Sequence, residues 1–518
     1  MKKSVILIEP GKYLGGMMTG GLGATDKGVV TTVGGVAKEF FQRIYRQYLD
    51  PAAWTFESRE SYVPKHGQIL TEPMQAQWYF EPKMATKVFD EMLKETQVKV
   101  VKNQCLNRKD GVAMRDGKIQ KITMENGDEY SARYFIDATY EGDLMAAAGV
   151  DYIVGREPVE RYGEAMNGVR TGDRVSMAGI SPYVVDGKPE SGLLPRVEPK
   201  PPGEPGAGDH RTQAYNFRMC LTNVPENRVP FEKPADYNPL EYEILLRMLV
   251  KKGRPIIPFK LTPMPNGKTD SNNALYISTD YIGGSYQWPE ATYAEREKIL
   301  AAHRTYVQGF FWFLQNDPRV PQGVRELAAP WGLAKDEFAD NGNWPTQLYV
   351  REARRMVGEH VMKQDNFSAK EKADPERKNP LPAVPKEPVA DPVAVGSYAL
   401  DSHTVSMFTD ETGGLFLEGN YSGGPRPYGI SYRSLLPKAG QCTNLLVPIC
   451  LSSSHVAYGS IRMEPVYMEL GQAAATAACL ALDEQTTPQK LRYPLLRERL
   501  LADGAVLDPD ALPTLKKK

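Results

Sequence analysis

Cysteine and histidine are scarce in this chain of 518 residues, which contains five cysteines and six histidines. The cysteines lie far apart, without the close pairs typical of metal and redox sites: Cys105, Cys220, Cys442, Cys450 and Cys479. This spacing argues against a disulfide framework, a zinc site and an iron–sulfur cluster. We therefore expect no metal centre.

An excess of positive charge is also missing, because 63 Lys and Arg face 64 Asp and Glu. Without it the chain cannot hold a phosphate backbone well, so we expect no nucleic-acid partner. The longest apolar run near the C-terminus, 473–482, covers about ten residues, too few to cross a bilayer. Hydrophobic residues at 41% and charged residues at 25% fit a soluble globular protein. We expect no membrane partner and, for the chain as numbered, a cytoplasmic location.

What the chain does have at its start is a continuous apolar run, 4–8, that ends in Glu9. Such a run predicts a strand buried on both faces, as in a parallel sheet. In nucleotide-binding folds an acid at the end of a strand accepts hydrogen bonds from the ribose hydroxyls. An ordinary surface acid is the alternative.

A glycine pair follows Glu9 within the segment Leu-Gly-Gly-Met-Met-Thr. Glycine lets the backbone approach a flat or anionic ligand, so this segment is a candidate cofactor loop. A plain turn is the alternative. The candidate residues are Gly15, Gly16, Met17, Met18 and Thr19.

Apolar spacing predicts helices farther along the chain, and tight-turn dipeptides predict a β-meander over 98–137. The meander leads into Asp-Ala-Thr-Tyr-Glu-Gly-Asp, where small residues would let the chain pass beneath a dinucleotide. The candidate cofactor residues there are Ala138, Thr139, Glu141 and Asp143, although Asp143 could simply cap a helix. The predicted helices cover 36–49, 83–96, 240–252, 292–316 and 349–362.

The late segment Gly-Ser-Ile-Arg-Met-Glu-Pro precedes an alanine-rich helix predicted from near Pro465 to Asp483. Proline suits the first helical turn, and free N–H groups at a helix N-terminus attract a negatively charged group. A reduced flavin carries such a charge. A core helix of small residues is the alternative. The candidate residues are Gly459, Ser460, Ile461 and Arg462.

The order of these segments resembles FAD-dependent oxidoreductases of the glutathione-reductase-like superfamily. More narrowly, it is similar to a bacterial FAD-dependent oxidoreductase family distantly related to the flavoprotein subunit of heterodisulfide reductase. The resemblance implies an α/β, Rossmann-type FAD-binding domain with an inserted mixed substrate domain, and FAD as cofactor. The implied division is 1–150 and 400–485 for the FAD domain, 151–399 for the insertion, and 486–518 for a C-terminal helix and tail.

The sequence departs from this family at its start. The family begins with a strand and a Gly-x-Gly-x-x-Gly turn, whereas this chain begins at the strand that carries Glu9. The missing unit, about thirty residues judging from the size of a βαβ motif, would supply a central strand and the main phosphate cradle. We expect a start codon placed too far downstream, which would also hide any secretion signal.

Hydride transfer with flavin needs a group that takes or gives a proton, and histidine titrates near neutral pH. His455 and His403 are the candidates, because His455 precedes Gly459 by four residues and His403 precedes a Gly-rich loop. A structural histidine is the alternative in each case.

Candidate substrate ligands are Arg351 and Arg355, on the helix predicted over 349–362, and Asn272 and Asn273 after a Pro/Gly turn. The arginines could bind an anion or pair with Glu352 and Glu359, and the asparagines could bind hydroxyl groups or form an Asx-turn.

We expect an FAD-dependent oxidoreductase that acts on a small polar organic molecule, a sugar or polysaccharide-derived compound among the candidates. One alternative is an electron-transfer subunit with an iron–sulfur partner protein. Another is a non-redox carbohydrate-binding or lyase-like protein that kept the fold.

Overall fold

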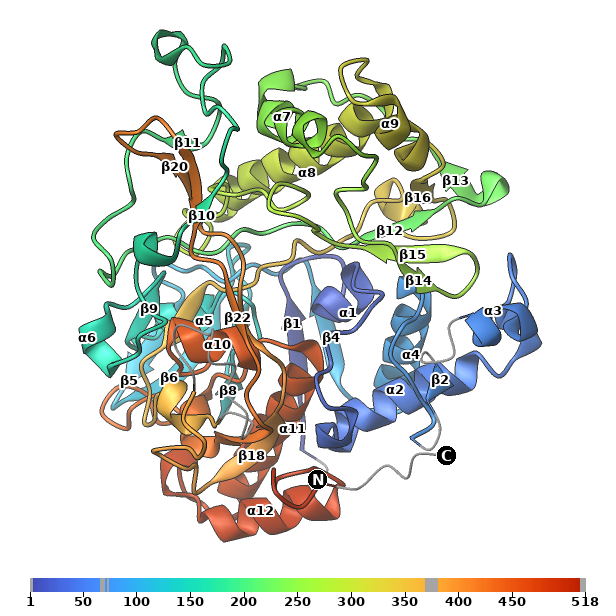
Figure 1. Cartoon of the computed structure of the whole chain (residues 1–518). Helices are drawn as coiled ribbons and strands as arrows, with labels where there is room; N and C mark the ends of the chain where they lie inside the picture. Colours follow the sequence, from blue (N-terminus) through green and yellow to red (C-terminus); the bar gives the residue numbers. More distant parts are fainter. Residues whose placement is uncertain (1–2, 66–69, 72–73, 369–380, 513–518) are drawn as a thin grey trace.

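Two separate pairs of parallel strands organise the first part of the chain, and the second of them joins it to the last part. In the computed structural model, which describes residues 3–65, 70–71, 74–368 and 381–512, β1 (Ile6–Glu9) pairs with β4 (Lys99–Lys102). The second pair joins β8 (Phe135–Ile136) to β24 (Leu445–Leu446). Figure 1 shows β1 and β4 near the centre of the molecule, above α11.

The predicted strand before Glu9 is confirmed, but its predicted burial on both faces is wrong. Val5 is 50% exposed and Ile6 is 47% exposed. Strand β1 pairs with β4 alone among the described residues, so its second edge lacks a neighbouring strand. Ile136 on β8 is likewise 37% exposed.

The predicted meander is confirmed over 112–130, where three antiparallel strands follow one another, but its first and last segments pair in parallel with β1 and β24 instead. The antiparallel strands are β5 (Val112–Arg115), β6 (Lys118–Thr123) and β7 (Glu129–Tyr130). Asp116 and Gly117 have φ angles of 51° and 66°, the left-handed geometry of a tight hairpin turn. After β8 the chain enters the short helix α5 (Asp143–Ala147).

Three predicted helices pack together around the N-terminal part. They are α2 (Gly35–Gln47), α4 (Pro82–Lys94) and α11 (Glu464–Asp483). Helix α2 buries Phe40, Phe41 and Ile44 in one apolar stripe, which packs near Val88 of α4. Helix α11 lies against the start of α2, where Glu469 accepts a hydrogen bond from the backbone N–H of Gly34.

The middle of the chain forms an antiparallel sheet covered by helices. The strand order is β13-β16-β12-β15-β14, and Figure 1 shows α7, α8 and α9 above it. Helix α8 begins with a capping box in which Thr292 and Glu295 bond each other's backbone N–H groups, and its Phe310 and Phe311 pack in the core. The bounds are Met219–Thr222 (β12), Arg228–Val229 (β13), Thr262–Met264 (β14), Lys268–Ser271 (β15), Gly332–Ala334 (β16), Glu243–Lys252 (α7), Tyr293–Asn316 (α8) and Gln322–Ala328 (α9).

The helix predicted over 349–362 is wrong. This segment contains β17 (Arg354–Met356), which pairs antiparallel with β9 (Tyr152–Val154). Successive strand residues point to opposite faces. Arg354 and Arg355 therefore reach different buried carboxylates, those of Asp143 and Glu157.

Short strand pairs complete the later part of the chain. A four-stranded sheet of order β10-β21-β20-β11 joins residues on both sides of the boundary predicted at 399, so the domain limits stay a prediction. The remaining strands are Leu70–Thr71 (β2), Ala76–Gln77 (β3), Val175–Ser176 (β10), Val197–Glu198 (β11), Pro392–Gly396 (β18), Leu400–Ser402 (β19), Ser406–Thr409 (β20), Leu415–Glu418 (β21), Tyr421–Gly423 (β22) and Tyr428–Ser431 (β23). The remaining helices are Gly16–Gly20 (α1), Arg59–Lys65 (α3), Val159–Tyr162 (α6), His455–Ile461 (α10) and Tyr493–Ala502 (α12).

None of the helices in the described ranges combines the length and apolarity needed to cross a membrane.

Candidate functional site

The hydroxyl group of Tyr140 connects three segments that are far apart in the sequence. It accepts a hydrogen bond from the backbone N–H of Met17 at 3.0 Å and donates one to Oε1 of Glu464 at 2.8 Å. The start of α1, the turn after β8 and the start of α11 therefore meet at one point. A Cβ on Gly16 would lie 2.5 Å from the Tyr140 hydroxyl oxygen, so this contact requires glycine.

The other candidate residues around α1 have protein partners. Gly15, with φ of 96°, lies against the side chain of Thr19, whose hydroxyl donates to the carbonyl of Leu14. Met17 and Met18 are buried in the core beside α2 and α4. Their role toward a cofactor stays a prediction.

Glu9 lies at the C-terminal end of β1, as predicted. Its Oε1 accepts a hydrogen bond from the backbone N–H of Gly11 at 2.8 Å. Burial raises the pKa of Glu9 above its usual value. The second carboxylate oxygen, Oε2, accepts no hydrogen bond from the described residues, which leaves it able to accept one from a ligand hydroxyl.

The segment after β8 is held by its own polar side chains. Thr139 donates from its hydroxyl to Asp137 at 2.7 Å and accepts from the backbone N–H of Gly142 at 3.0 Å. Ala138 lies between these partners in the sequence. Glu141 accepts a hydrogen bond from Nε1 of Trp288, and burial raises its pKa.

Asp143 neither caps α5 nor faces solvent freely. Its carboxylate pairs with Arg296 at 2.5 Å, Arg354 at 2.7 Å and Arg108 at 3.1 Å. Burial raises the pKa of Asp143, but the arginines outweigh it and bring the value to about 2. The residue at the N-cap position is Gly142. Asp143 thus ties α5 to the middle of the chain.

The candidate residues of the late segment lie inside α10. A Cβ on Gly459 would lie 2.5 Å from the carbonyl oxygen of Asp401, so glycine is needed for close packing on β19. Ser460 bonds the hydroxyl of Tyr428 at 2.7 Å and the carbonyl of Tyr398 at 2.6 Å. Ile461 is fully buried in the core.

Arg462 ends α10 and lies in a polar environment. Its guanidinium donates to Asp401 at 2.8 Å and to the hydroxyl of Tyr349 at 3.1 Å. Its Nε is buried and has no hydrogen-bond partner in the described ranges. The predicted helix start at Pro465 is confirmed, because α11 begins at Glu464 with Pro465 in its first turn.

In both candidate histidines Nδ1 bonds a carboxylate that also pairs with an arginine. Nδ1 of His403 lies 2.6 Å from Asp280, whose other oxygen pairs with Arg351 at 2.9 Å. We call this set the His403 triad.

Nδ1 of His455 lies 2.8 Å from Glu352, which is 3.5 Å from Arg355. We call this set the His455 triad. Burial raises the pKa of Glu352, but His455 and Arg355 lower it to about 2.

Gln213 joins the two triads. Its Oε1 accepts from the backbone N–H of His403 at 3.0 Å, and its own backbone N–H donates to Glu352 at 3.3 Å. The side-chain Nε2 of Gln213 is buried and unpartnered among the described residues, as is Nε2 of His455. Two buried polar atoms at this junction therefore lack a hydrogen-bond partner in the described ranges, which suits a polar ligand or water.

Exposure separates the two histidines. The side chain of His403 is 14% exposed and also lies 3.4 Å from Asp401, which is 26% exposed. The side chain of His455 is 1% exposed. Part of the His403 imidazole is therefore open to solvent, whereas His455 is enclosed.

Two of the predicted substrate ligands, Arg351 and Arg355, belong to the triads themselves. Arg351 and Arg355 are fully buried and already paired with carboxylates, so neither offers a free positive charge to an anionic substrate. Asn272 accepts a hydrogen bond from Nδ2 of Asn216 at 2.8 Å. The Oδ1 of Asn216 is buried and unpartnered in the described part of the chain. Asn273 forms a backbone bridge with Phe259.

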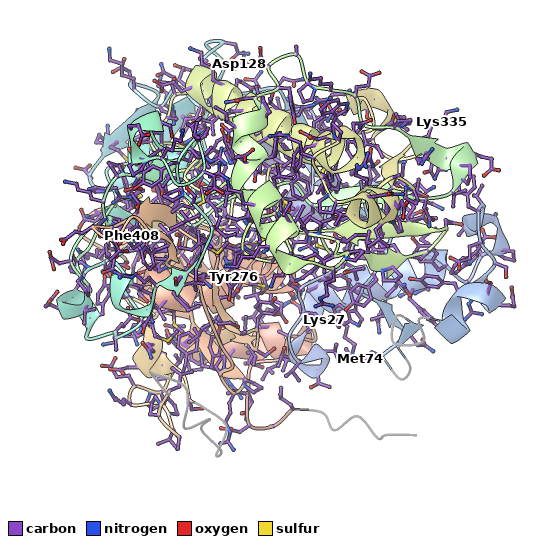
Figure 2. The ribbon with its side chains drawn as sticks, turned by 45° about the horizontal axis from the view of Figure 1, so that its top comes forward. Lys27, Met74, Asp128, Tyr276, Lys335 and Phe408 are labelled. Atoms are coloured by element: carbon purple, nitrogen blue, oxygen red, sulfur yellow. The ribbon has the colours of Figure 1, made fainter. Side chains whose placement is uncertain are left out.

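The loop from Asn272 to Asp280 also carries the exposed Tyr276, which Figure 2 labels near the middle of the view. This loop therefore connects the Asn216–Asn272 contact with the carboxylate of the His403 triad.

Sequence reasoning missed Tyr140, Glu464 and Asp280 as members of this site. Tyr140 and Glu464 lie inside two of the segments chosen as candidate cofactor sites, so the sequence could have indicated both residues. Asp280 is distant from both histidines in the sequence, and no local pattern marks it.

A separate carboxylate group has the spacing of a metal site but contains a lysine. Oxygens of Glu81, Asp336 and Glu337 lie within 4.8 Å of one another. The buried Nζ of Lys268 lies 2.6 to 2.7 Å from all three side chains. The ammonium group thus supplies the positive charge that a cation would bring.

Comparison with known proteins adds the identity of the chain. A search of curated proteins gave no match. The model of the family described as FAD dependent oxidoreductase matches residues 1–500. This family has a Rossmann-type α/β fold that binds FAD, in agreement with the mixed sheets and helices seen here. The chain therefore belongs to the FAD-dependent oxidoreductase family and is a flavin-dependent redox enzyme with FAD as its cofactor.

Proposed function

We propose that this enzyme transfers hydride between FAD and a small polar organic substrate with a hydroxyl or carbonyl group, of the kind that sugars provide. His403 is the residue that takes or gives the proton. The observation that carries this proposal is the partly exposed imidazole of His403, held between Asp280 at 2.6 Å and Asp401 at 3.4 Å.

The residues present fit FAD as the bound group. Glu9 keeps one carboxylate oxygen for a ribose hydroxyl, and the Gly15–Gly16 turn lies beside the start of α11 through Tyr140. Buried polar atoms without partners in the described ranges, at Gln213 and Arg462, lie at the same junction. Bound FAD supplies the centre that accepts or donates hydride.

The side chains of the His403 triad divide the proton chemistry among them. When His403 accepts a proton from a substrate hydroxyl, the carboxylates of Asp280 and Asp401 offset the positive charge it gains. Arg351 holds Asp280 in place, and Arg462 holds Asp401. Because both arginines are engaged in this way, the site favours an uncharged hydroxylated substrate over an anion.

His455 is a positioning residue in this proposal. Its imidazole is enclosed and holds Glu352 in place. Glu352 accepts a hydrogen bond from the backbone N–H of Gln213, and the side-chain oxygen of Gln213 accepts one from the backbone N–H of His403. A change at His455 would therefore act on His403 through three successive hydrogen bonds.

A pair of histidine variants tests the assignment of His403. The gene, extended upstream if in-frame sequence encodes an apolar strand and a Gly-rich turn, should give yellow protein that releases flavin on denaturation. His403→Asn should lower the rate of substrate-dependent flavin bleaching by about 10²- to 10⁴-fold with the flavin spectrum unchanged. His210→Asn, at an exposed histidine outside both triads, is the matched control.

Two results would contradict the proposal. Equal bleaching rates in His403→Asn and wild-type protein would remove His403 from the chemistry. Bleaching by a protein electron donor, with no response to a screen of sugars and other small hydroxylated compounds, would favour an electron-transfer subunit instead.

A further inference from the structure

Glu464 differs from the other carboxylates near the His403 triad because it has no cationic partner. Asp26 pairs with Arg218 at 3.2 Å, and Asp401 pairs with Arg462 at 2.8 Å. In the described ranges, no Lys, Arg or His forms an ion pair with Glu464, which accepts one hydrogen bond, from Tyr140. A partly buried carboxylate without a compensating charge is costly, so the neutral acid is favoured.

The groups around Glu464 determine how strongly it holds a proton. Burial raises the pKa of Glu464 to about 7, the Tyr140 hydroxyl lowers it, and the negative charge of Asp26 raises it. Tyr467 on α11 also faces this carboxyl group, while Arg462, two residues earlier, is engaged with Asp401. The free N–H groups at the start of α11 favour the carboxylate. These opposing influences keep the titration close to neutral pH.

The location of Glu464 allows its titration to respond to a bound cofactor. It begins α11, a helix of 20 residues whose first turn has no side-chain cap, and Tyr140 joins it to the Gly15–Gly16 turn. The carboxyl oxygen Oε2 accepts no hydrogen bond in the described part of the chain, and the residue is partly exposed. Solvent protons can therefore reach it.

We propose that Glu464 takes up a proton from solvent when negative charge develops on the cofactor bound beside the start of α11, and releases it when that charge is removed. The inference rests on the proposed placement of FAD. The proton moves between water and a carboxylate oxygen, and the two electrons come from the substrate or from an added reductant. Like charges close together raise a carboxyl pKa, which is the physical basis of the coupling.

The reduction potential of the flavin, measured without substrate, tests the proposal. A photochemically generated organic reductant is used between about pH 6 and pH 9, so that wild type and Glu464→Gln are compared on both sides of neutrality. Above about pH 7 the wild-type potential should fall more steeply with pH than that of Glu464→Gln, by up to one additional proton per two electrons. Glu484→Gln, at the exposed far end of the same helix, should match the wild type.

Tyr140→Phe provides a second arm because it removes the hydrogen bond that lowers the pKa of Glu464. The pH at which the slope steepens should then move upward. In the chain without cofactor, the infrared difference between wild type and Glu464→Gln should show a protonated carboxylic acid band that is lost as pH rises through neutrality.

The outcomes separate this inference from the proposed function. Equal potential slopes in wild type and Glu464→Gln would overturn the inference and leave the assignment of His403 standing. An infrared band unaffected by Glu464→Gln would also overturn it. A chain that binds no flavin, even when extended upstream, would overturn both.

Discussion

Nδ1 of His455 lies 2.8 Å from Oε2 of Glu352, and both side chains are almost completely enclosed. Arg355, fully buried as well, lies 3.5 Å from the same oxygen and 2.9 Å from Glu157. The charged groups come from separate parts of the chain and neutralise one another inside the protein. This arrangement makes the interior polar network sensitive to the loss of any one charge.

Replacement of Glu352 by Gln should destabilise the fold, because it leaves His455 and Arg355 with less compensating negative charge. Breaking a buried ion pair from one side costs about 3–5 kcal/mol, so thermal unfolding should occur at a clearly lower temperature. Glu359→Gln is the control, because Glu359 is exposed. The amide oxygen of the new side chain can still accept the hydrogen bond that the backbone N–H of Ala439 donates to Glu359. Similar unfolding temperatures for both variants would contradict this account of the triad.

Lys268→Met should convert the lysine-containing carboxylate group into a cation site. Without the ammonium group, the oxygens of Glu81, Asp336 and Glu337 repel one another, and stability should fall by about 3–5 kcal/mol. Ca²⁺ prefers carboxylate oxygens and should restore part of this loss in the variant. Thermal unfolding with and without Ca²⁺ measures the effect, and a wild-type protein stabilised equally by Ca²⁺ would contradict the assignment.

Asp143 should contribute to stability in a pH-dependent way. Its pKa is about 2 in the folded protein, below the unfolded value of about 3.9, because its arginine partners outweigh burial. The contribution, about 2 kcal/mol, is therefore complete above about pH 4 and is lost as pH falls toward 2. Urea unfolding of wild type and Asp143→Asn should differ at pH 7 and converge near pH 2. A constant difference across this range would show that Asp143 acts through packing instead.

Two glycine substitutions in neighbouring helices should have opposite effects. Gly459→Ala would place a Cβ 2.5 Å from the Asp401 carbonyl oxygen and should destabilise the protein by about 1–3 kcal/mol. Gly471 in α11 has no atom within 4 Å of an added Cβ, so Gly471→Ala should be neutral or stabilise by up to about 1 kcal/mol. Denaturant midpoints compare the two, and equal midpoints would argue against tight packing of α10 on β19.

The elements that the sequence predicted well are those whose signals are local. The apolar spacing in α2, α4 and α8 requires only neighbouring residues, and the Asp116-Gly117 turn needs two. The helix predicted over 349–362 failed for the opposite reason. Arg351, Arg354 and Arg355 are placed by ion pairs with Asp280, Asp143 and Glu157, which lie far away in the sequence.

The candidate site shows the same division. Both histidines were identified from local context, but only one of their two carboxylate partners could be considered from the sequence. Glu352 was considered as an ion-pair partner of the arginines, and it also supports His455. Asp280 comes to His403 only through the fold, because the loop after β15 folds back toward β19. The bridging role of Gln213 depends on backbone groups, which sequence patterns do not report.

The pairing of β8 with β24 has a consequence for biosynthesis. Strand β8 leaves the ribosome early, whereas β24 is translated only after several hundred further residues. The nascent chain therefore carries an unmatched apolar strand during most of its synthesis, when aggregation is a hazard. Expression at low temperature or with added chaperones should consequently raise the yield of native enzyme.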